Sequence, residues 1–341
     1  MLNSYIFSKI LKQNIKTKLF IFLIFIFFPF IVNNSYYQHL MILVMMWIVI
    51  GSGWNVIAGY TGQVSFGDAA FFGTGAYTAG LLSHQLNISP WWGMAFGGIT
   101  AMVIALPFGW ICFRLKGAYF ALATLALNEV MRHVATLWES LTDGMVGILI
   151  MQSFVSKIPY YYIALSLAVF SVFSVSYIMN TKWGYYFVSI REDQDAAESL
   201  GINTHLYKMI SLNIAAFLTG MAGALYMNYM GFIDPEVVFS LHDISIMAIL
   251  VGIVGGVGTI YGPVVGAFVM VAVQEIIRTG FFGILQEVAR LIEIEFIDTI
   301  IKYIMQAHVM VFGILVVLVI LYLPNGIVGD YGKIKQIFSK K

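Results

Sequence analysis

The stretch LMILVMMWIVIGSGWNVIA, residues 40–58, contains nineteen residues and no charged side chain. A helix needs about 20 apolar residues to cross the hydrocarbon core of a bilayer, so this stretch is long enough to span a membrane. It is followed directly by GYTGQVSFGD, residues 59–68, where glycines and polar side chains interrupt the apolar sequence. Together the two segments predict a membrane helix that ends in a polar break.

The composition indicates that most of the chain is built in the same way. Hydrophobic residues make up 60% of the 341 residues and charged residues only 10%, against roughly 45–50% and about 25% in soluble proteins. The apolar content suffices for about ten spans of about 20 residues. A net charge of +1 argues against a nucleic-acid binder. The single cysteine, Cys112, excludes an internal disulfide and a cysteine-based zinc site.

These observations predict an all-α polytopic membrane protein with about ten transmembrane helices, eight being the alternative number. The membrane domain covers 19–326, between a basic N-terminus, 1–18, and a C-terminal tail, 327–341. The predicted spans are 19–32, 39–58, 68–83, 91–113, 117–137, 159–179, 207–230, 241–257, 260–279 and 303–323.

The distribution of lysine and arginine gives the orientation. With the N-terminus in the cytoplasm and ten crossings, 13 basic residues face inward and 5 face outward, as the positive-inside rule requires. We therefore expect both termini, and the polar stretch 181–206, on the cytoplasmic side. The outward set is Arg132, Lys157, Arg278, Arg290 and Lys302.

Several kinds of site are missing from the sequence. The only Gly-Lys pair, Gly332–Lys333, is followed by Ile334, so no Walker A loop is present and this chain binds no ATP in that way. The six histidines are scattered without ligand spacing, so we predict no metal and no enzymatic activity. Within 285–304, apolar residues recur at helical spacing and charged residues lie off that stripe, which predicts an amphipathic helix at the outer interface. This helix is either a connector that packs on its neighbours or a docking surface for an external protein.

The break at 59–68 has two interpretations. Non-helical backbone at membrane depth is tolerated only where it is buried in protein or lines a wet cavity, and an ionisable group there is costly and usually functional. Thr61, Gln63, Ser65 and Asp68 are therefore candidates for a translocation pathway. The alternative is an ordinary cytoplasmic turn with Asp68 as an N-cap. After it, small residues including Gly75 offer a surface for close helix packing.

A second glycine-rich break lies near residue 257. Small residues four apart let helices approach closely, which predicts helix packing at this break. Breaks near 60 and 257 also match the pattern of internally repeated transporters. The glycines concerned are Gly252, Gly256, Gly258, Gly262 and Gly266.

The longest polar stretch contains REDQDAAESLG, residues 191–201. Asp193 and Asp195 suit a helix N-terminus and Gly201 suits a C′ position, so we predict a short, capped, exposed helix. Ala196 and Ala197 would let a partner approach closely. The helix is either a solvated connector or a contact for a cytoplasmic motor subunit. In the predicted span 117–137, Glu129 and Arg132 are three residues apart, and we expect their side chains to form an ion pair.

Five segments in order give the chain a family resemblance. They are 59–80, ending FFGTGAY; RLKGAYFALATL at 114–125 with Glu129 and Arg132; Thr142-Asp143-Gly144 with Gly147-Ile148; Ile190 to Gly201; and Pro324-Asn325-Gly326. In this order they resemble the permease subunits of high-affinity branched-chain amino acid ABC importers, in the LivM-like branch. The resemblance covers roughly residues 40–330.

The resemblance implies a permease domain in the bacterial cytoplasmic (inner) membrane. It implies a homologous second permease subunit (LivH-like), two cytoplasmic ATPases that bind ATP and Mg, and an external substrate-binding protein; the chain itself has no cofactor. It assigns ATPase coupling to Arg191, Glu192, Asp195, Ala196, Ala197, Glu198 and Gly201, and adds Tyr119, Thr124 and Glu129 to the candidate pathway. Four positions depart from the family pattern: Asp68 replaces His or Gln, Tyr185 replaces Arg, Asp195 replaces Glu, and Asn213 replaces Pro.

Two alternatives remain at this level. A urea or short-amide ABC permease would share this architecture, and the sequence does not decide between the substrates. An ion-coupled secondary transporter would need no ATPase. A neighbouring gene that encodes a Walker A ATPase would support the ABC importer, and its absence would favour the secondary transporter.

Overall fold

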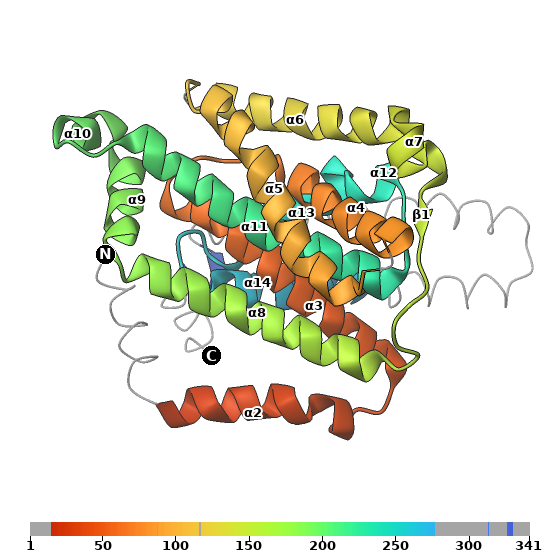
Figure 1. The fold of residues 1–341 in the computed structure, drawn as a ribbon. Helices are drawn as coiled ribbons and strands as arrows, with labels where there is room; N and C mark the ends of the chain where they lie inside the picture. The colour runs from red at the N-terminus through yellow and green to blue at the C-terminus, as the bar shows by residue number, and fades with distance from the viewer. Residues whose placement is uncertain (1–14, 87, 116, 277–312, 314–325, 330–341) are drawn as a thin grey trace, which may run out of the picture.

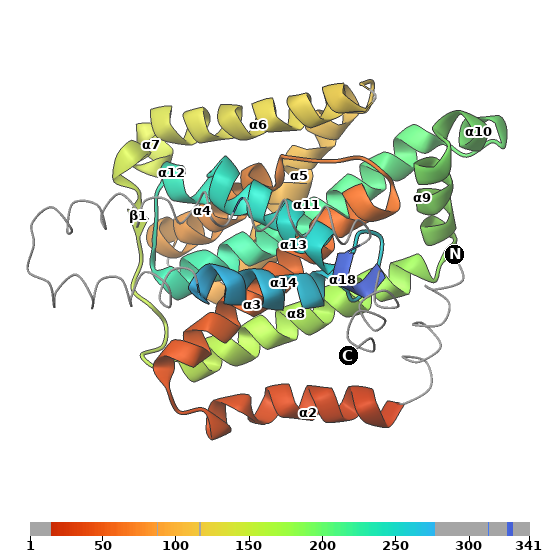
Figure 2. The same ribbon diagram turned by 180° about the vertical axis from the view of Figure 1, so that it is seen from behind.

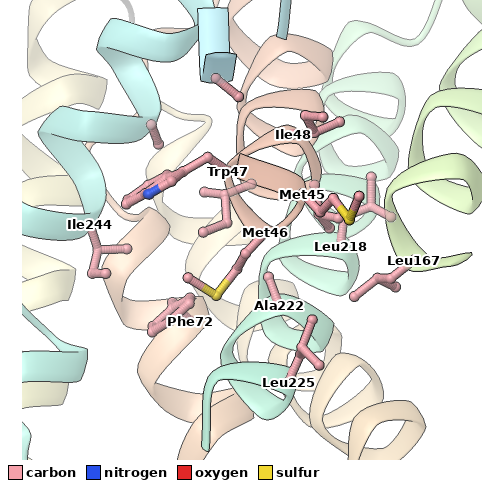
Figure 3. Packing of buried hydrophobic residues seen from close by; sticks show 14 of the residues in the cluster. Met45, Met46, Trp47, Ile48, Phe72, Leu167, Leu218, Ala222, Leu225 and Ile244 are labelled. Atoms are coloured by element: carbon pink, nitrogen blue, oxygen red, sulfur yellow. The ribbon is translucent and has the colours of Figure 1, made fainter. Parts of the chain in front are cut away.

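Helix α3 (Ser35–Trp54) forms the centre of the structure. The computed structural model describes residues 15–86, 88–115, 117–276, 313 and 326–329. Four consecutive residues of α3, Met45 to Ile48, are all buried. Figure 3 shows them packed against side chains from surrounding helices, among them Phe72, Leu167, Leu218, Ala222 and Leu225. Because α3 is apolar around its whole circumference, it is buried on every side rather than along one stripe.

Three helices meet beside α3 through backbone-to-backbone contacts. They are α4 (Asp68–Leu86), α5 (Pro90–Cys112) and α11 (Thr204–Met230). A Cβ at Gly75 of α4 would overlap the Gly220 carbonyl of α11, and one at Gly97 of α5 would lie 2.9 Å from the Gly75 carbonyl. In a bilayer such close packing replaces the hydrophobic effect as the force between helices, because lipid tails are themselves apolar. Gly75 thus lies at the close contact between α4 and α11.

The remaining helices surround this centre (Figure 1). Helix α8 (Lys157–Met179) packs along α3, and α2 (Ile15–Ile31) lies beside α8. Two hydrogen bonds connect α8 to α2: Tyr161 Oη donates to the Phe25 carbonyl at 2.7 Å, and Tyr162 Oη donates to the Ile26 carbonyl at 2.8 Å. Helix α6 (Ala118–Leu137) lies at the periphery. The described elements are completed by η1 (Asn55–Tyr60), α7 (Glu139–Thr142), η2 (Gly144–Val146), α9 (Lys182–Glu192), α10 (Gln194–Ser199), α12 (Pro235–Val238), η3 (Leu241–Ile246), α13 (Met247–Gly255), α14 (Gly262–Glu275) and α18 (Gly326–Gly329).

The architecture is all-α, as expected, apart from one short two-stranded ribbon. Strand β1 (Ile148–Leu149) pairs antiparallel with β2 (Phe232–Ile233), with Ile148 opposite Ile233. Gly147 precedes β1 with φ +78°, and a Cβ there would overlap the Ile233 carbonyl. This ribbon lies at the end of the molecule opposite α9 and α10 (Figure 1).

Five helical segments in the described part of the chain are long and apolar enough to cross a membrane. They are Ser35–Tyr60, Pro90–Cys112, Lys157–Met179, Thr204–Met230 and Pro235–Gly255. The protein is therefore a multi-pass membrane protein. The predicted spans at 19–32, 68–83, 117–137 and 260–279 correspond to helices α2, α4, α6 and α14, which are shorter or less apolar. The expected span 303–323, the amphipathic segment 285–304 and most of both termini lie outside the described residues.

Candidate functional site

The polar break after α3 is an ordered structure. Helix α3 runs into the π-helical turn η1, and the backbone leaves the helix at Thr61, whose hydroxyl donates to the Ile57 carbonyl at 2.5 Å. Ser65 is held from both sides: Trp54 Nε1 donates to its carbonyl at 3.1 Å, and its hydroxyl accepts from the Gly67 amide at 3.1 Å. Thr124 of α6 accepts from the Phe66 amide at 3.0 Å. The backbone groups freed by the break are thus satisfied inside the protein.

Asp68 begins helix α4, one position inside the helix rather than at the N-cap. A carboxylate in the first turn is favoured by the helix dipole. Its side chain is buried, and Oδ2 has no hydrogen-bond partner among the described residues. The amide of Ala69 donates to Ser245 Oγ at 2.9 Å, which places Asp68 beside η3. A buried, unpartnered carboxylate oxygen is uncommon and marks this position as a functional candidate.

The candidate pathway residues do not form one cluster. Thr61, Ser65 and Thr124 belong to the break, and Gln63 donates to the Thr61 carbonyl at 3.3 Å. Tyr119, in contrast, is 71% exposed on α6.

Glu129 lies further along α6 and forms the expected pair with Arg132, at 2.8 Å. Arg132 also binds Glu236 of α12 at 2.5 Å, and the three side chains are 39%, 25% and 58% exposed. The pairing is confirmed. The sequence did not show the second carboxylate, which α12 supplies.

The second glycine-rich break packs directly on the first. Asn55 joins them: its Oδ1 accepts from the Gly258 amide and its Nδ2 donates to the Thr259 carbonyl, both at 2.8 Å. Gly59 fits beneath, since a Cβ there would lie 2.6 Å from the Gly258 nitrogen. The two breaks, about 200 residues apart in the sequence, are therefore fastened by one buried asparagine.

The glycines of the second break are divided between two helices and the loop that joins them. Gly256 and Gly258 form the loop between α13 and α14, with φ +129° and +70°. Gly262 and Gly266 are on α14, where added Cβ atoms would overlap the carbonyls of Gly256 and Val251; Gly252 lies under the Trp54 ring. Three of the five glycines thus lie at close contacts, and the other two form the turn.

Arg191 reaches the point where the two breaks meet. It lies near the end of α9, and its Nη1 donates to the Gly59 carbonyl at 3.0 Å. A Cβ at Gly62 would lie 3.1 Å from Arg191 Cγ, and one at Gly258 would lie 2.8 Å from Nη1. We name this meeting point of Asn55, Gly59, Gly62, Arg191 and Gly258 the joint. The guanidinium connects α9 to both breaks at once.

The predicted helix 191–201 is in fact two helices. Arg191 and Glu192 end α9, and Asp193 then caps α10 by accepting from the Ala196 amide at 3.0 Å. The amide of Gly201 bonds to the Glu198 carbonyl at 2.9 Å and that of Ile202 to the Ala197 carbonyl at 3.1 Å, which completes a Schellman motif. Gly201 has φ +84°, so its predicted C′ role is confirmed.

Helix α10 is fastened to the start of α11. Lys208, buried in α11, donates from Nζ to Gln194 Oε1 at 2.6 Å. Glu198 accepts from Gln194 Nε2 at 2.9 Å and from the Thr204 hydroxyl at 2.5 Å. The outward surface of α10 includes Asp195, Ala196, Ser199 and Leu200, the last 82% exposed.

Ala197 corrects a sequence-based expectation. It is only 2% exposed, so it packs inside this chain and does not face a partner. Its neighbour Ala196 is exposed, as predicted. The difference arises because α10 is short and one side of it packs against the segment that leads into α11. The sequence of α10 alone does not show which side this is.

Three residues of this region escaped the sequence analysis: Asn55, Gln194 and Lys208. Asn55 is a polar residue inside an otherwise apolar run, and Lys208 is a charge at the start of another. Polar groups in such positions are costly unless paired, and that cost was the available signal. Gln194 carried no such signal.

A bundle of membrane helices with two internal breaks, fastened to a rigid helical projection at one end, defines a membrane transport permease. The chain matches the model of the family described as "Branched-chain amino acid transport system / permease component" over residues 36–320, and it belongs to that family.

Curated relatives agree with this assignment. The high-affinity branched-chain amino acid transport system permease protein LivM of Escherichia coli is 26% identical over 314 residues, covering 80% of this chain and 72% of that protein. The corresponding LivH of Salmonella typhimurium is 22% identical over 303 residues, covering 82% and 90%. The autoinducer 2 import system permease LsrC of Yersinia pseudotuberculosis is 24% identical over 115 residues, a third of each chain. No solved structure gives a significant match.

Proposed function

We propose that this chain is a permease subunit of an ATP-driven, binding-protein-dependent importer of branched-chain amino acids. Family membership and the relatives named LivM and LivH support this assignment. The chain pairs with a homologous second permease subunit, as the existence of two kinds of relative suggests. Two cytoplasmic ATPases supply the energy, and an external protein delivers the substrate.

One observation carries the mechanism: the Arg191 guanidinium connects α9 to both breaks of the membrane domain. Helix α10 presents an exposed surface at the end of the molecule, and its cap, its Schellman turn and the Lys208 contact make it rigid. A motor that binds this surface would move α9, and Arg191 would transmit the displacement to the 59–67 and 256–261 segments. The exposed members of the coupling set, Asp195 and Ala196, are the proposed contacts.

The translocation pathway follows from the same arrangement. Segment 59–67 and Asp68 lie where α4, α6 and η3 come together. The Asp68 carboxylate, through its unpartnered Oδ2, is the proposed contact for the ammonium group of the amino acid. Thr61, Gln63, Ser65 and Thr124 line or position that segment. Tyr119 and Glu129 are not proposed as pathway residues, because they lie away from it.

We propose ten crossings with both termini in the cytoplasm. Helices α2, α4, α6, α14 and a helix at 303–323 would then join the five long apolar segments. The basic residues Arg114, Lys182, Arg191 and Lys208 lie on segments at the α9–α10 end, which supports a cytoplasmic position for that end. A cysteine introduced at exposed Ser199 tests this. An impermeant thiol reagent should label it in inverted vesicles, and labelling from outside intact cells would overturn the orientation.

Reconstitution tests the function itself. The chain is expressed with the ATPases, second permease and binding protein encoded beside it, and the complex is placed in liposomes. Uptake of leucine that requires ATP, persists with ionophores and fails without the binding protein is the expected result. Uptake of urea instead of leucine would favour the short-amide alternative. Uptake abolished by ionophores without any ATP requirement would favour a secondary transporter.

A further inference from the structure

An open apolar groove runs along the outer surface between α5 and α11. It encloses about 810 Å³ and is lined by apolar side chains, among them Ile99, Val103 and Met209. Val103 is 59% exposed, so the groove faces outward from the helix bundle. An open apolar groove on a membrane helix bundle faces either lipid or another protein.

The length of the groove matches one leaflet of a bilayer. Its lining on α5 extends from Ile99 to Trp110. At 1.5 Å of rise per residue this is about 17 Å, close to half of the roughly 30 Å hydrocarbon thickness. A single acyl chain inserted from the headgroup region would therefore end near the far end of the groove.

Polar and aromatic groups gather at one end of this groove. Trp110 and Trp183 line that end together with Asn203 and His205. Tryptophan is enriched where the bilayer core meets the headgroups, which places the interface at this end. The end lies on the α9–α10 side, which the proposed orientation places in the cytoplasm.

Two exposed basic side chains lie at that end, and the carboxylate of Glu198 accepts there from the Thr204 hydroxyl. The Arg114 guanidinium lies 4.4 Å from the centre of the Trp110 ring, and exposed Lys182 precedes Trp183. None of the lining residues that the structure describes is acidic. Basic residues at the membrane surface attract anionic lipid headgroups.

We propose that this groove is a binding site for an anionic phospholipid, whose acyl chain lies along α5 and α11 and whose phosphate faces Arg114 and His205. The site is independent of the transported substrate. Since the groove contacts α11, which also holds α10 through Lys208, an occupied groove would support the segment that carries the coupling helix.

Quenching of tryptophan fluorescence by brominated acyl chains tests the proposal. The complete transporter is reconstituted in phosphatidylcholine vesicles, and brominated phosphatidylglycerol or brominated phosphatidylcholine is added as a minor component. The signal of Trp110 is the difference between the wild type and Trp110→Phe. We expect quenching at a several-fold lower fraction of the anionic lipid than of the zwitterionic one.

Three variants sharpen the result. Arg114→Ala should lower the preference for the anionic lipid about fivefold, the effect of one basic residue near the surface. Lys157→Ala, which removes a basic residue at the opposite end, should leave it unchanged. Val103→Phe, which fills the open groove, should reduce quenching by both lipids. Equal quenching by both lipids in the wild type would overturn the proposal, and so would protection from both, which would show that the second permease subunit covers the groove.

Discussion

Removing the Arg191 side chain should separate ATP hydrolysis from transport. Arg191→Ala deletes the 3.0 Å bond from the guanidinium to the Gly59 carbonyl and empties the space between Gly62 and Gly258. Hydrogen bonds to charged groups contribute about 1.5–3 kcal/mol. Because the side chain is 36% exposed, water competes for the donor, and the lower end applies. About 1.5 kcal/mol corresponds to roughly a tenfold loss of the joined arrangement.

The assay compares three quantities in one preparation: the ATPase that purifies with the membrane complex, ATP hydrolysis, and uptake in proteoliposomes. We expect ATPase recruitment to remain, because Asp193, Gln194 and Lys208 still hold α10 in place. Uptake should fall about tenfold while hydrolysis falls much less. The result would be an uncoupled transporter.

Glu192→Ala is the matched control. Glu192 is 61% exposed and contacts only the outward side of the Arg191 guanidinium, at 2.6 Å. Exposed ion pairs contribute about 0.2–1 kcal/mol, so uptake should change no more than a few fold. Wild-type uptake by Arg191→Ala would refute the role of the joint. Loss of the ATPase from the membrane would show that Arg191 holds the docking helix rather than transmitting its movement.

Three further predictions follow from local geometry. Gly201→Val should strain the turn after α10 by about 1–2 kcal/mol, because the φ of +84° is unfavourable for valine although a Cβ there has no neighbour within 4 Å. ATPase recruitment and uptake should fall while the membrane abundance, measured by immunoblot, stays near normal. Gly201→Asn, which tolerates this conformation, should recover both recruitment and uptake. Gly75→Val should abolish membrane accumulation of the chain, since the valine side chain would overlap the backbone of α11. The control Ala126→Val, on the exposed side of α6, should accumulate normally. Normal accumulation of both variants would contradict the tight packing. Arg132→Ala should lower thermal stability more than Glu129→Ala, because it leaves two carboxylates without their shared cation; a reversed order in a melting experiment would show that the second ion pair contributes nothing.

Local features of this protein could be predicted from the sequence because neighbouring residues produce them. The run 40–58 has the length and composition of a spanning helix whatever lies around it, and α3 occupies it. Gly201 follows a short polar helix, and its left-handed backbone conformation is one that glycine adopts most readily. Glu129 and Arg132 are one helical turn apart, so their contact needs no other element.

The joint could not be predicted, because it depends on segments far apart in the chain. Asn55 and Gly258 are held together by helix packing in three dimensions, and Arg191 reaches Gly59 across 132 positions of sequence. The same limit explains Ala197, whose burial depends on the chain that leads into α11.

The sequence by itself determined that this chain crosses a membrane, where its helices break and where a short capped helix follows, because hydrophobic length, glycine and capping residues act over a few residues. Its order of motifs also pointed to the permease family. Only the tertiary structure decided that both breaks and the end of α9 meet at one guanidinium, and which side of α10 remains exposed. Such contacts form when packing brings distant segments together, and no spacing along the chain encodes that distance.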